Sequence, residues 1–347
     1  MAATRSIHRW AAECVTLFLV LGLVGCLERT ETITVEPDGT VLIEAVFKTD
    51  QEGELYEGDA IPSDAGGWLV EVQEVEQDGE RRFHLTAAGV FGPLFKLPAN
   101  YAVPGDPDTA LYLQFPTTVE IEDRADGVYY HFHRTYPARP WAHIEALREV
   151  LLDGPTRKLK DKDKDDYTPA DWKLIARSYT DFEAAKLLTF ARGAYLETTP
   201  DVPQDAWLDV LGAFRKMQGE LDLDVIAEVM QIDDEDEREE AIALEVKAWE
   251  EKSFKTLDAS LRDFCGYGGA RMKDFMRRYQ SRLKDYDVTS GLGDDAFVIT
   301  VVMPGAIVGS NADETSPDRA TWKFSGRRFR DRRVELMVTS RSDFLDP

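Results

Sequence analysis

The chain has 347 residues, a formal net charge of −24 and a hydrophobic share of 43%. This length is enough for two domains or for one large domain with an insertion, and the hydrophobic share is ordinary for a protein with a packed core. Because so acidic a surface repels polyanions, neither nucleic acid nor anionic lipid headgroups are expected as partners.

The first residues are typical of an export signal. Arg5 and Arg9 precede an apolar run from Cys14 to Val24, which is short for a membrane-spanning helix. We therefore predict that residues 1–25 are a signal peptide. Its removal takes away a net charge of +1 (Arg5, Arg9 and Glu13) and leaves about −25 on the remaining chain. No second apolar run of membrane-spanning length follows, so we expect a soluble body behind the signal.

The signal ends in Leu23-Val24-Gly25-Cys26, which resembles the lipobox of bacterial lipoproteins. The resemblance implies cleavage between Gly25 and Cys26 and acylation of Cys26, palmitate included. The membrane would then be a partner through the N-terminal lipid, because two or three acyl chains anchor a protein durably. It further implies the cell envelope and, since Leu27 is not aspartate, an outer membrane facing the periplasm in a host with two membranes. The alternative is an ordinary signal peptide with a chance cysteine.

Cysteine usage fits an exported, anchored protein. Cys14 leaves with the signal and Cys26 is lipidated, so Cys265 remains as a single thiol and no intramolecular disulfide is expected. A single cysteine of this kind is typically a buried apolar residue, and a reactive thiol is the alternative.

The chain after the signal alternates polar and apolar residues and predicts β-hairpins. Turn residues such as Pro37-Asp38-Gly39 separate the runs, and a segment rich in Gly and Pro (89–109) is expected to be a loop. The predicted strands of this part are 30–36, 40–47, 68–76, 81–86, 118–122 and 128–133.

From about residue 138 the apolar spacing changes to three and four residues and predicts helices. Thr168 is a plausible N-cap, with Pro169 at the first helical position and Asp171 at the positive end of the helix dipole. Further helices are expected at 203–217, 221–230, 233–264 and 272–283. After Gly291 strands return, at 296–303, 321–324 and 333–339.

These elements predict an α+β fold. Strands from both ends of the chain form an antiparallel sheet or sandwich, and a large helical insertion lies between them in the sequence. The predicted β domain comprises residues 26–137 plus 290–341, and the helical insertion comprises residues 138–289.

A hairpin directly after the lipid cysteine is followed, late in the chain, by a strand–Pro–Gly–loop–Trp–strand segment with Met303-Pro-Gly305, Asn311 and Trp322. Together these features resemble the LppM-type bacterial lipoproteins. The resemblance covers parts of the two ends. It implies an envelope location and a β body, and no mechanism. A C-terminal membrane helix, which that type often carries, is not expected here.

His131 and His133 are the best metal candidates, with His143 ten residues further on. Residues i and i+2 of a strand point to the same face, so the two imidazoles could share a metal ion, and Glu120 or Glu122 of the neighbouring strand could add a ligand. The alternative is two solvent-facing histidines that bind nothing.

Three other patterns have simpler explanations than a site. Asp161–Asp166 resembles a calcium loop but lacks its glycine and its glutamate, which favours a solvated linker. The acidic run Asp233–Glu237 is typical of a helix start, with cation or basic-partner binding as the alternative. Cys265-Gly-Tyr-Gly-Gly269 favours a turn between helices over a nucleophile, since no histidine lies nearby.

No catalytic motif is recognised, no cofactor is expected, and an enzyme is not favoured. The leading interpretation is a non-enzymatic envelope lipoprotein whose helical insertion offers a surface to an envelope protein partner. Two alternatives stay open: a metal-dependent envelope enzyme using His131 and His133, and a carrier holding an apolar ligand between sheet and helices. Most of the aromatic side chains of the insertion are expected to fill its own core; they are Trp172, Trp207, Trp249 and Phe254.

Overall fold

The computed structural model divides the chain into two compact units, a β unit (27–142 with 284–343) and a helical unit (143–283). The helical unit is inserted between N- and C-terminal strands, so the predicted α+β class is confirmed. The predicted signal peptide and Cys26 lie outside the described residues. The structure describes residues 27–50, 52–55, 59–77, 80–139, 141–163, 166–199, 205–220, 222–229, 231–232, 235–293 and 295–343.

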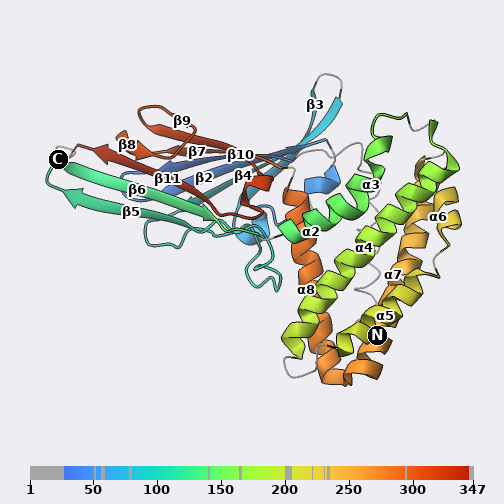
Figure 1. Cartoon of the computed structure of the whole chain (residues 1–347). Coiled ribbons are helices and arrows are strands. Elements are labelled where there is room, and N and C mark those ends of the chain that lie inside the picture. Colours follow the sequence, from blue (N-terminus) through green and yellow to red (C-terminus); the bar gives the residue numbers. More distant parts are fainter. Residues whose placement is uncertain are drawn as a thin grey trace. The chain divides into compact units, whose positions relative to one another are not determined.

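Within these residues the strands of the β unit form two sheets (Figure 1). The seven-stranded sheet A has the order β3-β4-β2-β1-β7-β10-β9, and the four-stranded sheet B has the order β5-β6-β11-β8. The strands are β1 (Glu28–Val35), β2 (Val41–Thr49), β3 (Leu69–Gln77), β4 (Glu80–Phe91), β5 (Thr117–Arg124), β6 (Gly127–Tyr136), β7 (Ala296–Val302), β8 (Ala306–Ser310), β9 (Glu314–Thr315), β10 (Arg319–Ser325) and β11 (Val334–Ser342).

Strand β1 joins the two ends of the chain in one sheet. It pairs antiparallel with β2 and parallel with β7, which follows the helical unit in the sequence. Alternate β1 side chains are buried, because the strand lies in the middle of sheet A and one of its faces covers the core. The parallel β1–β7 pair is possible because the inserted helices supply the long crossover that parallel strands need.

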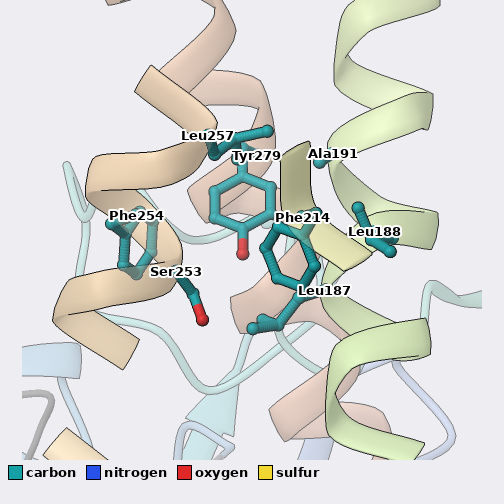
Figure 2. Close-up of a pocket in the computed structure, with 8 residues that line it drawn as sticks. All are labelled: Leu187, Leu188, Ala191, Phe214, Ser253, Phe254, Leu257 and Tyr279. Atoms are coloured by element: carbon teal, nitrogen blue, oxygen red, sulfur yellow. The ribbon is translucent and has the colours of Figure 1, made fainter. Parts of the chain in front are cut away.

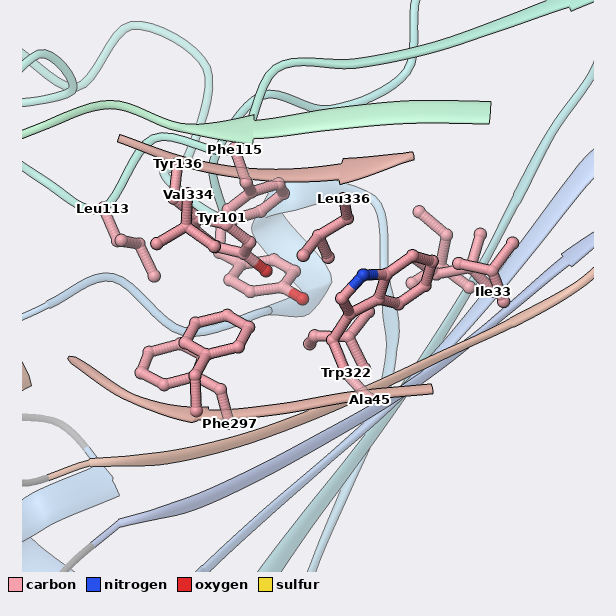
Figure 3. Packing of buried hydrophobic residues seen from close by; sticks show 14 of the residues in the cluster. Ile33, Ala45, Tyr101, Leu113, Phe115, Tyr136, Phe297, Trp322, Val334 and Leu336 are labelled. Atoms are coloured by element: carbon pink, nitrogen blue, oxygen red, sulfur yellow. The ribbon is translucent and has the colours of Figure 1, made fainter. Parts of the chain in front are cut away.

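The two sheets pack face to face around one hydrophobic core (Figure 3). Ile33, Phe297 and Trp322 of sheet A face Tyr136 and Leu336 of sheet B. Tyr136 stacks on Phe329 with ring centroids 5.9 Å apart and meets Phe324 edge to face at 5.5 Å. This packing fixes the relative position of the two sheets.

The helical unit is built from long helices. The start of α4 has the predicted capping: Thr168 accepts a hydrogen bond from the Asp171 backbone, the Asp171 carboxylate accepts one from the Thr168 backbone, and Pro169 opens the helix. The described helices are α2 (Ala142–Arg148), α3 (Gly154–Thr156), α4 (Pro169–Thr198), α5 (Ala206–Gln218), α6 (Leu223–Val229), α7 (Glu235–Cys265) and α8 (Gly269–Leu292). Shorter helical turns are Glu52–Leu55, Asp64–Gly66, Glu149–Asp153, Arg157–Leu159 and Gly326–Phe329.

Aromatic side chains fill the interior of the helical unit, as predicted for most of them. Trp207 and Trp249 are buried, and Trp172 and Phe254 are half-buried. Helix α5 packs on α7, and α4 packs on α6. Among the described residues, no helix combines the length and apolar character that a membrane crossing requires.

Candidate functional site

The described part of the chain enters the sheet directly after the predicted lipid cysteine. Leu27 is buried, its carbonyl accepts a hydrogen bond from the Ala296 backbone at 3.2 Å, and Glu28 is already paired in the sheet with Lys48 and Ala296. Ser325 of β10 pairs with Ala296 from the other side. We call this end of the β unit, marked by Leu27, Glu28, Ala296 and Ser325, the anchor end. No linker separates Cys26 in sequence from the first strand.

A buried ionic group holds β1 in place at the anchor end. The Arg29 Nε donates to Asp295 Oδ2 at 2.8 Å, and its Nη1 donates to Asp59 Oδ2 at 3.1 Å. Burial opposes the charge of Arg29, but the carboxylates of Asp295 and Asp59 outweigh that effect, and the pKa of Arg29 is raised above its usual value. The first residues of β1 are therefore held by charge-assisted bonds as well as by the sheet.

A second buried ionic group, one pleat further along β1, bridges the two sheets. Arg134 of β6, with none of its surface exposed, donates through Nη1 to Glu31 Oε2 of β1 at 2.5 Å and through Nε to Thr117 Oγ1 at 2.9 Å. Its Nη2 has no hydrogen-bond partner among the described residues. Burial raises the pKa of Tyr136 beside it, and burial with the Glu31 charge raises the pKa of Tyr101.

These buried groups hold charge rather than move protons. An arginine does not release its proton in a protein, and tyrosines with raised pKa values stay protonated at neutral pH. The Arg134 guanidinium also lies 4.8 Å from the centroid of the Phe115 ring. The cluster therefore orders the interior of the sandwich and offers no acid–base pair to a substrate.

His131 and His133 lie on one face of β6, as expected from their spacing. The structure gives them different partners. His131 Nε2 is 3.5 Å from Glu122 Oε2, and His133 Nε2 is 3.9 Å from Glu335 Oε1. Glu122 is also bound by Arg124 at 2.6 Å, which lowers the pKa of its carboxyl.

No group of three or more His, Cys, Asp and Glu side chains suited to a metal ion occurs in the described parts of the chain. Glu120 and Glu122 of β5 were the predicted carboxylate ligands. The Glu122 carboxylate lies near His131, whereas Glu120 is the residue opposite His131 in the strand register. His143 is exposed in α2. The metal site at His131 and His133 stays a prediction.

Cys265 lies buried at the end of α7. Burial raises the pKa of its thiol above the usual value, and burial likewise raises the pKa of the nearby Tyr195 to about 12. A thiol that stays protonated is a poor nucleophile. The helix ends here, Gly266 has a φ of +63°, and α8 begins at Gly269, which supports the predicted turn between helices.

The two acidic segments differ in how much of them is described. Asp161, Asp163 and Asp166 are exposed, as in the predicted linker, while residues 164–165 are outside the described residues. Lys162 binds Asp171 at 2.6 Å and so takes part in the capping of α4. Of the run 233–237, residues 233–234 are not described and Glu235 begins α7.

A small cavity of about 10 Å³ lies inside the helical unit (Figure 2). This volume is close to what one water molecule needs and is far below that of a lipid or drug-sized ligand. It therefore gives no support to the apolar-carrier alternative. The cavity is lined by Leu187, Leu188, Ala191, Phe214, Ser253, Phe254, Leu257 and Tyr279.

Sequence reasoning missed an exposed apolar cluster at the end of the β unit opposite the anchor end. Large apolar side chains gather near the turn that follows β1, where a Cβ on Gly39 would touch Pro93 at 3.3 Å. The backbone of Phe95 donates to the Gly92 carbonyl at 2.9 Å, which holds a tight turn. We call Val90 (72% exposed), Leu94 (97%) and Phe95 (75%) the distal apolar cluster; Leu69 (79%) lies nearer the middle of the sheet, in register with Ala88, Glu44 and Thr32. Val90, Leu94 and Phe95 fall within the predicted loop 89–109, which has no apolar periodicity, although Val90 belongs to β4 in the structure.

A second missed feature is the segment from Gly326 to Arg333, which carries five arginines in an otherwise acidic chain. It crosses from β10 of sheet A to β11 of sheet B at the anchor end. The high density of arginine is a feature of the sequence itself, Arg327-Arg328-Phe329-Arg330-Asp331-Arg332-Arg333, but a net charge for the whole chain does not show such a local basic segment.

No protein-family model and no curated protein sequence matches the chain. One solved structure with similarity is the NMR structure of the folded domain of the Mycobacterium tuberculosis LppM protein, at 10% sequence identity and a TM-score of 0.28, covering 94% of this chain and 95% of that chain. A likeness of this size carries no argument about fold or function. The resemblance of the two ends to LppM-type lipoproteins therefore rests on the sequence motifs.

Proposed function

We propose that the chain is a non-enzymatic envelope lipoprotein, held to a membrane through lipid on Cys26, which presents the distal apolar cluster to a protein partner. The observation that carries the proposal is the arrangement of the β unit. The first described residue, Leu27, is bound at the anchor end. Three of the four most exposed large apolar side chains among the described residues, Val90, Leu94 and Phe95, lie at or just beyond the other end of the sheet.

The length of β1 supports this arrangement. Strands rise about 3.3 Å per residue, so the eight residues of β1 place the turn at Gly39 on the order of 25 Å from the anchor end. Val90 pairs with Leu42 in the strand next to β1, beside that turn. A protein tethered at one end of the sheet would thus hold the cluster away from the bilayer, where a partner can reach it.

The chemistry of the cluster favours a protein as the partner. Large exposed apolar patches commonly mark protein interfaces, and the cores of such interfaces are enriched in aromatic and other apolar side chains. Phe95 and Leu94 on a tight turn have the form of anchor residues, since the turn costs little ordering on binding. Leu69 lies on β3, the edge strand of sheet A, so a partner could also pair with the edge.

The helical unit, which the sequence favoured as the interaction surface, exposes apolar residues such as Val150, Leu208 and Leu244 to a smaller fraction than Val90, Leu94 and Phe95. Exposed apolar residues are in themselves ordinary on a protein surface. The helical unit remains an alternative docking surface, and it supplies the matched control for the experiment.

The test is cross-linking in intact cells, read by mass spectrometry of the purified adducts. The variants are wild type, Cys26→Ala, the double substitution Leu94→Ser/Phe95→Ser, and the control Leu208→Ser/Leu244→Ser. We expect one envelope protein to be captured by wild type and by the control, and to be lost from both Cys26→Ala and the Leu94/Phe95 variant. Loss from the control instead would place the surface on the helical unit, and no captured partner at all would reject the proposal.

A further inference from the structure

The segment Gly326–Arg333 brings a concentrated positive charge to the anchor end. It contains five arginines and one aspartate, whereas the chain as a whole is strongly acidic. Electrostatic interactions at a surface are screened within about 8 Å at physiological ionic strength. A nearby charged surface therefore responds to this local segment, and much less to acidic residues further away on the molecule.

The segment is held rigidly at the point where the chain meets its predicted anchor. The Gly326 backbone donates to the Asp295 carbonyl at 3.0 Å, next to the row in which Ser325, Ala296 and Glu28 pair. Neighbouring strands lie about 4.8 Å apart, so the Cα atoms of Ser325 and Glu28 are separated by about 10 Å. The arginines thus begin about two strand widths from the residues that follow Cys26.

Phe329 fixes the middle of the segment. Its side chain is fully buried and stacks on Tyr136, and its carbonyl accepts a hydrogen bond from the Arg139 backbone at 2.9 Å. With Phe329 pointing into the core, the flanking Arg327, Arg328, Arg332 and Arg333 are left exposed. The burial of Phe329 therefore holds the neighbouring arginine side chains at the surface.

Several acidic groups of the same end are already neutralised by other partners. Asp295 and Asp59 are paired with the buried Arg29, and Asp285 is paired with Arg139 at 2.6 Å. Arg328 and Arg332, by contrast, form no ion pair with any described residue. Of the exposed arginines, Arg333 lies 3.3 Å from Glu335. Glu28, Asp50, Glu74 and Glu76 remain as exposed carboxylates at this end, of which Asp50 and Glu74 are paired with Arg82 and Arg81.

We propose that the segment Gly326–Arg333 is a membrane-contact surface that binds the anionic headgroups of the bilayer in which Cys26 is anchored. This inference rests on the lipid anchoring of the proposed function and deepens it. Arginine suits phosphate headgroups because its planar guanidinium donates two parallel hydrogen bonds to phosphate oxygens. A lipid and a basic patch together form the two-part anchor that holds peripheral proteins stably.

This surface differs from what the net charge alone predicts. The charge of the chain argues against anionic headgroups as partners of a free protein, but a tethered protein presents one end to the bilayer. With the anchor end at the surface, the four exposed arginines meet the headgroups and the distal end is turned away from them. Contact at the anchor end would also keep the distal apolar cluster oriented toward the aqueous side.

The test uses the mature protein purified from membranes, with its N-terminal lipid checked by mass spectrometry. A fluorophore on Ser325→Cys reports proximity to the bilayer through quenching by nitroxide-labelled headgroups. The protein is reconstituted into vesicles of phosphatidylcholine alone or of phosphatidylcholine with phosphatidylglycerol. Arg328→Gln/Arg332→Gln removes the two arginines that form no ion pair with a described residue. Lys96→Gln/Arg319→Gln removes the same charge from exposed sites at the distal end.

We expect stronger quenching with phosphatidylglycerol, and loss of the difference at about 1 M salt, where screening acts within about 3 Å. Each basic side chain at an anionic surface contributes about fivefold to binding, so the Arg328/Arg332 variant should lower the equilibrium constant for surface contact about 25-fold. The Lys96/Arg319 variant should match the parent. Circular dichroism and thermal unfolding check that both variants are folded.

Equal quenching on both kinds of vesicle, or equal quenching in the Arg328/Arg332 variant and the parent, would overturn the inference. Capture of an acidic protein by the arginine segment in cells, without lipid dependence, would overturn it as well. If mass spectrometry finds no lipid on Cys26, the anchoring itself has failed. The basic segment is then tested separately, by co-sedimentation of the same protein with the two vesicle types, so that the two failures are distinguishable.

Discussion

The Arg134 guanidinium of β6 and the Glu31 carboxylate of β1 meet at 2.5 Å in the interior of the β unit and join its two sheets. Both side chains are surrounded by the apolar core that includes Phe115 and Tyr136. Removing two such charges from water is costly, and their mutual attraction offsets the cost only while the pair is intact. Removing one partner alone should therefore lower the free energy of unfolding, because the other charge stays buried without a counter-charge.

We predict that Arg134→Met lowers the free energy of unfolding by about 3–5 kcal/mol, because it leaves the Glu31 carboxylate buried without its counter-charge. Urea denaturation followed by circular dichroism gives the change.

The double variant Glu31→Leu/Arg134→Met is the control, since it removes both charges together. It should lose much less stability than the sum of the two single variants. Additive losses would mean that the two side chains act independently.

A second prediction concerns the start of α4, where Thr168 caps the helix. Thr168→Ala should lower the free energy of unfolding by about 1 kcal/mol, because the Asp171 backbone amide loses its hydrogen-bond acceptor. Thermal unfolding measures the effect. Thr180→Ala, which removes a hydroxyl bonded to Ala176 within the same helix, is the control and should change stability by less.

The carboxylate of Asp171 adds a pH dependence to this helix start. Hydrogen bonds from Lys162, then from Thr168, hold the pKa of Asp171 well below its usual value. The folded protein therefore binds a proton at Asp171 less readily than the unfolded chain, so its contribution to stability is complete above about pH 4 and is lost as the pH falls below that value. The stability difference between wild type and Asp171→Asn should shrink in the same direction, and unfolding curves at neutral and acidic pH test this. A difference that grows toward acidic pH would contradict the assignment.

Much of the fold could be predicted because its determinants are local. The alternation in 30–36 and 40–47 predicted β1 and β2, and the Thr168–Pro169–Asp171 pattern predicted the start of α4 to the residue. The pairing of β1 with β7 is different. It joins residues far apart in the sequence in a parallel register, and the alternation of side chains in a strand carries no information about its neighbour.

The candidate sites were harder to predict for a related reason. The spacing of His131 and His133 correctly places both on one face of β6, but the groups near them come from β5 and β11, whose register the sequence does not state. The position of the arginine segment beside the start of β1 follows from the strand pairing, in which Ser325 and Glu28 flank the same residue, Ala296. The exposure of Leu94 and Phe95 is likewise a property of the folded loop, because a Gly- and Pro-rich stretch has no periodic pattern that separates buried from exposed side chains.

Two glycines, Gly326 and Gly212, differ in whether a side chain would meet a backbone atom or open space. A Cβ on Gly326 would lie 1.7 Å from the Leu292 carbonyl oxygen, a backbone atom that cannot move alone. Gly326→Ala should therefore shift the start of the arginine segment and lower stability by about 1–3 kcal/mol, as overpacking of a close contact does. A Cβ on Gly212, inside α5 and exposed, would meet nothing within 4 Å. Gly212→Ala should instead raise stability by about 0.5–1 kcal/mol, because alanine loses less freedom in a helix.

Guanidinium denaturation of the two variants beside wild type distinguishes these effects. Opposite signs would show that the crossing from β10 to β11 depends on the close approach of Gly326 to the end of α8, both of which belong to the β unit. If Gly326→Ala were as stable as wild type, the segment would have room to relax, and its arginines would not be held at a fixed distance from Glu28. The same variant in the vesicle experiment would then show unchanged quenching. If it is destabilised as expected, the quenching difference between the two vesicle types should decrease with it, because the arginines keep their charge and lose their position.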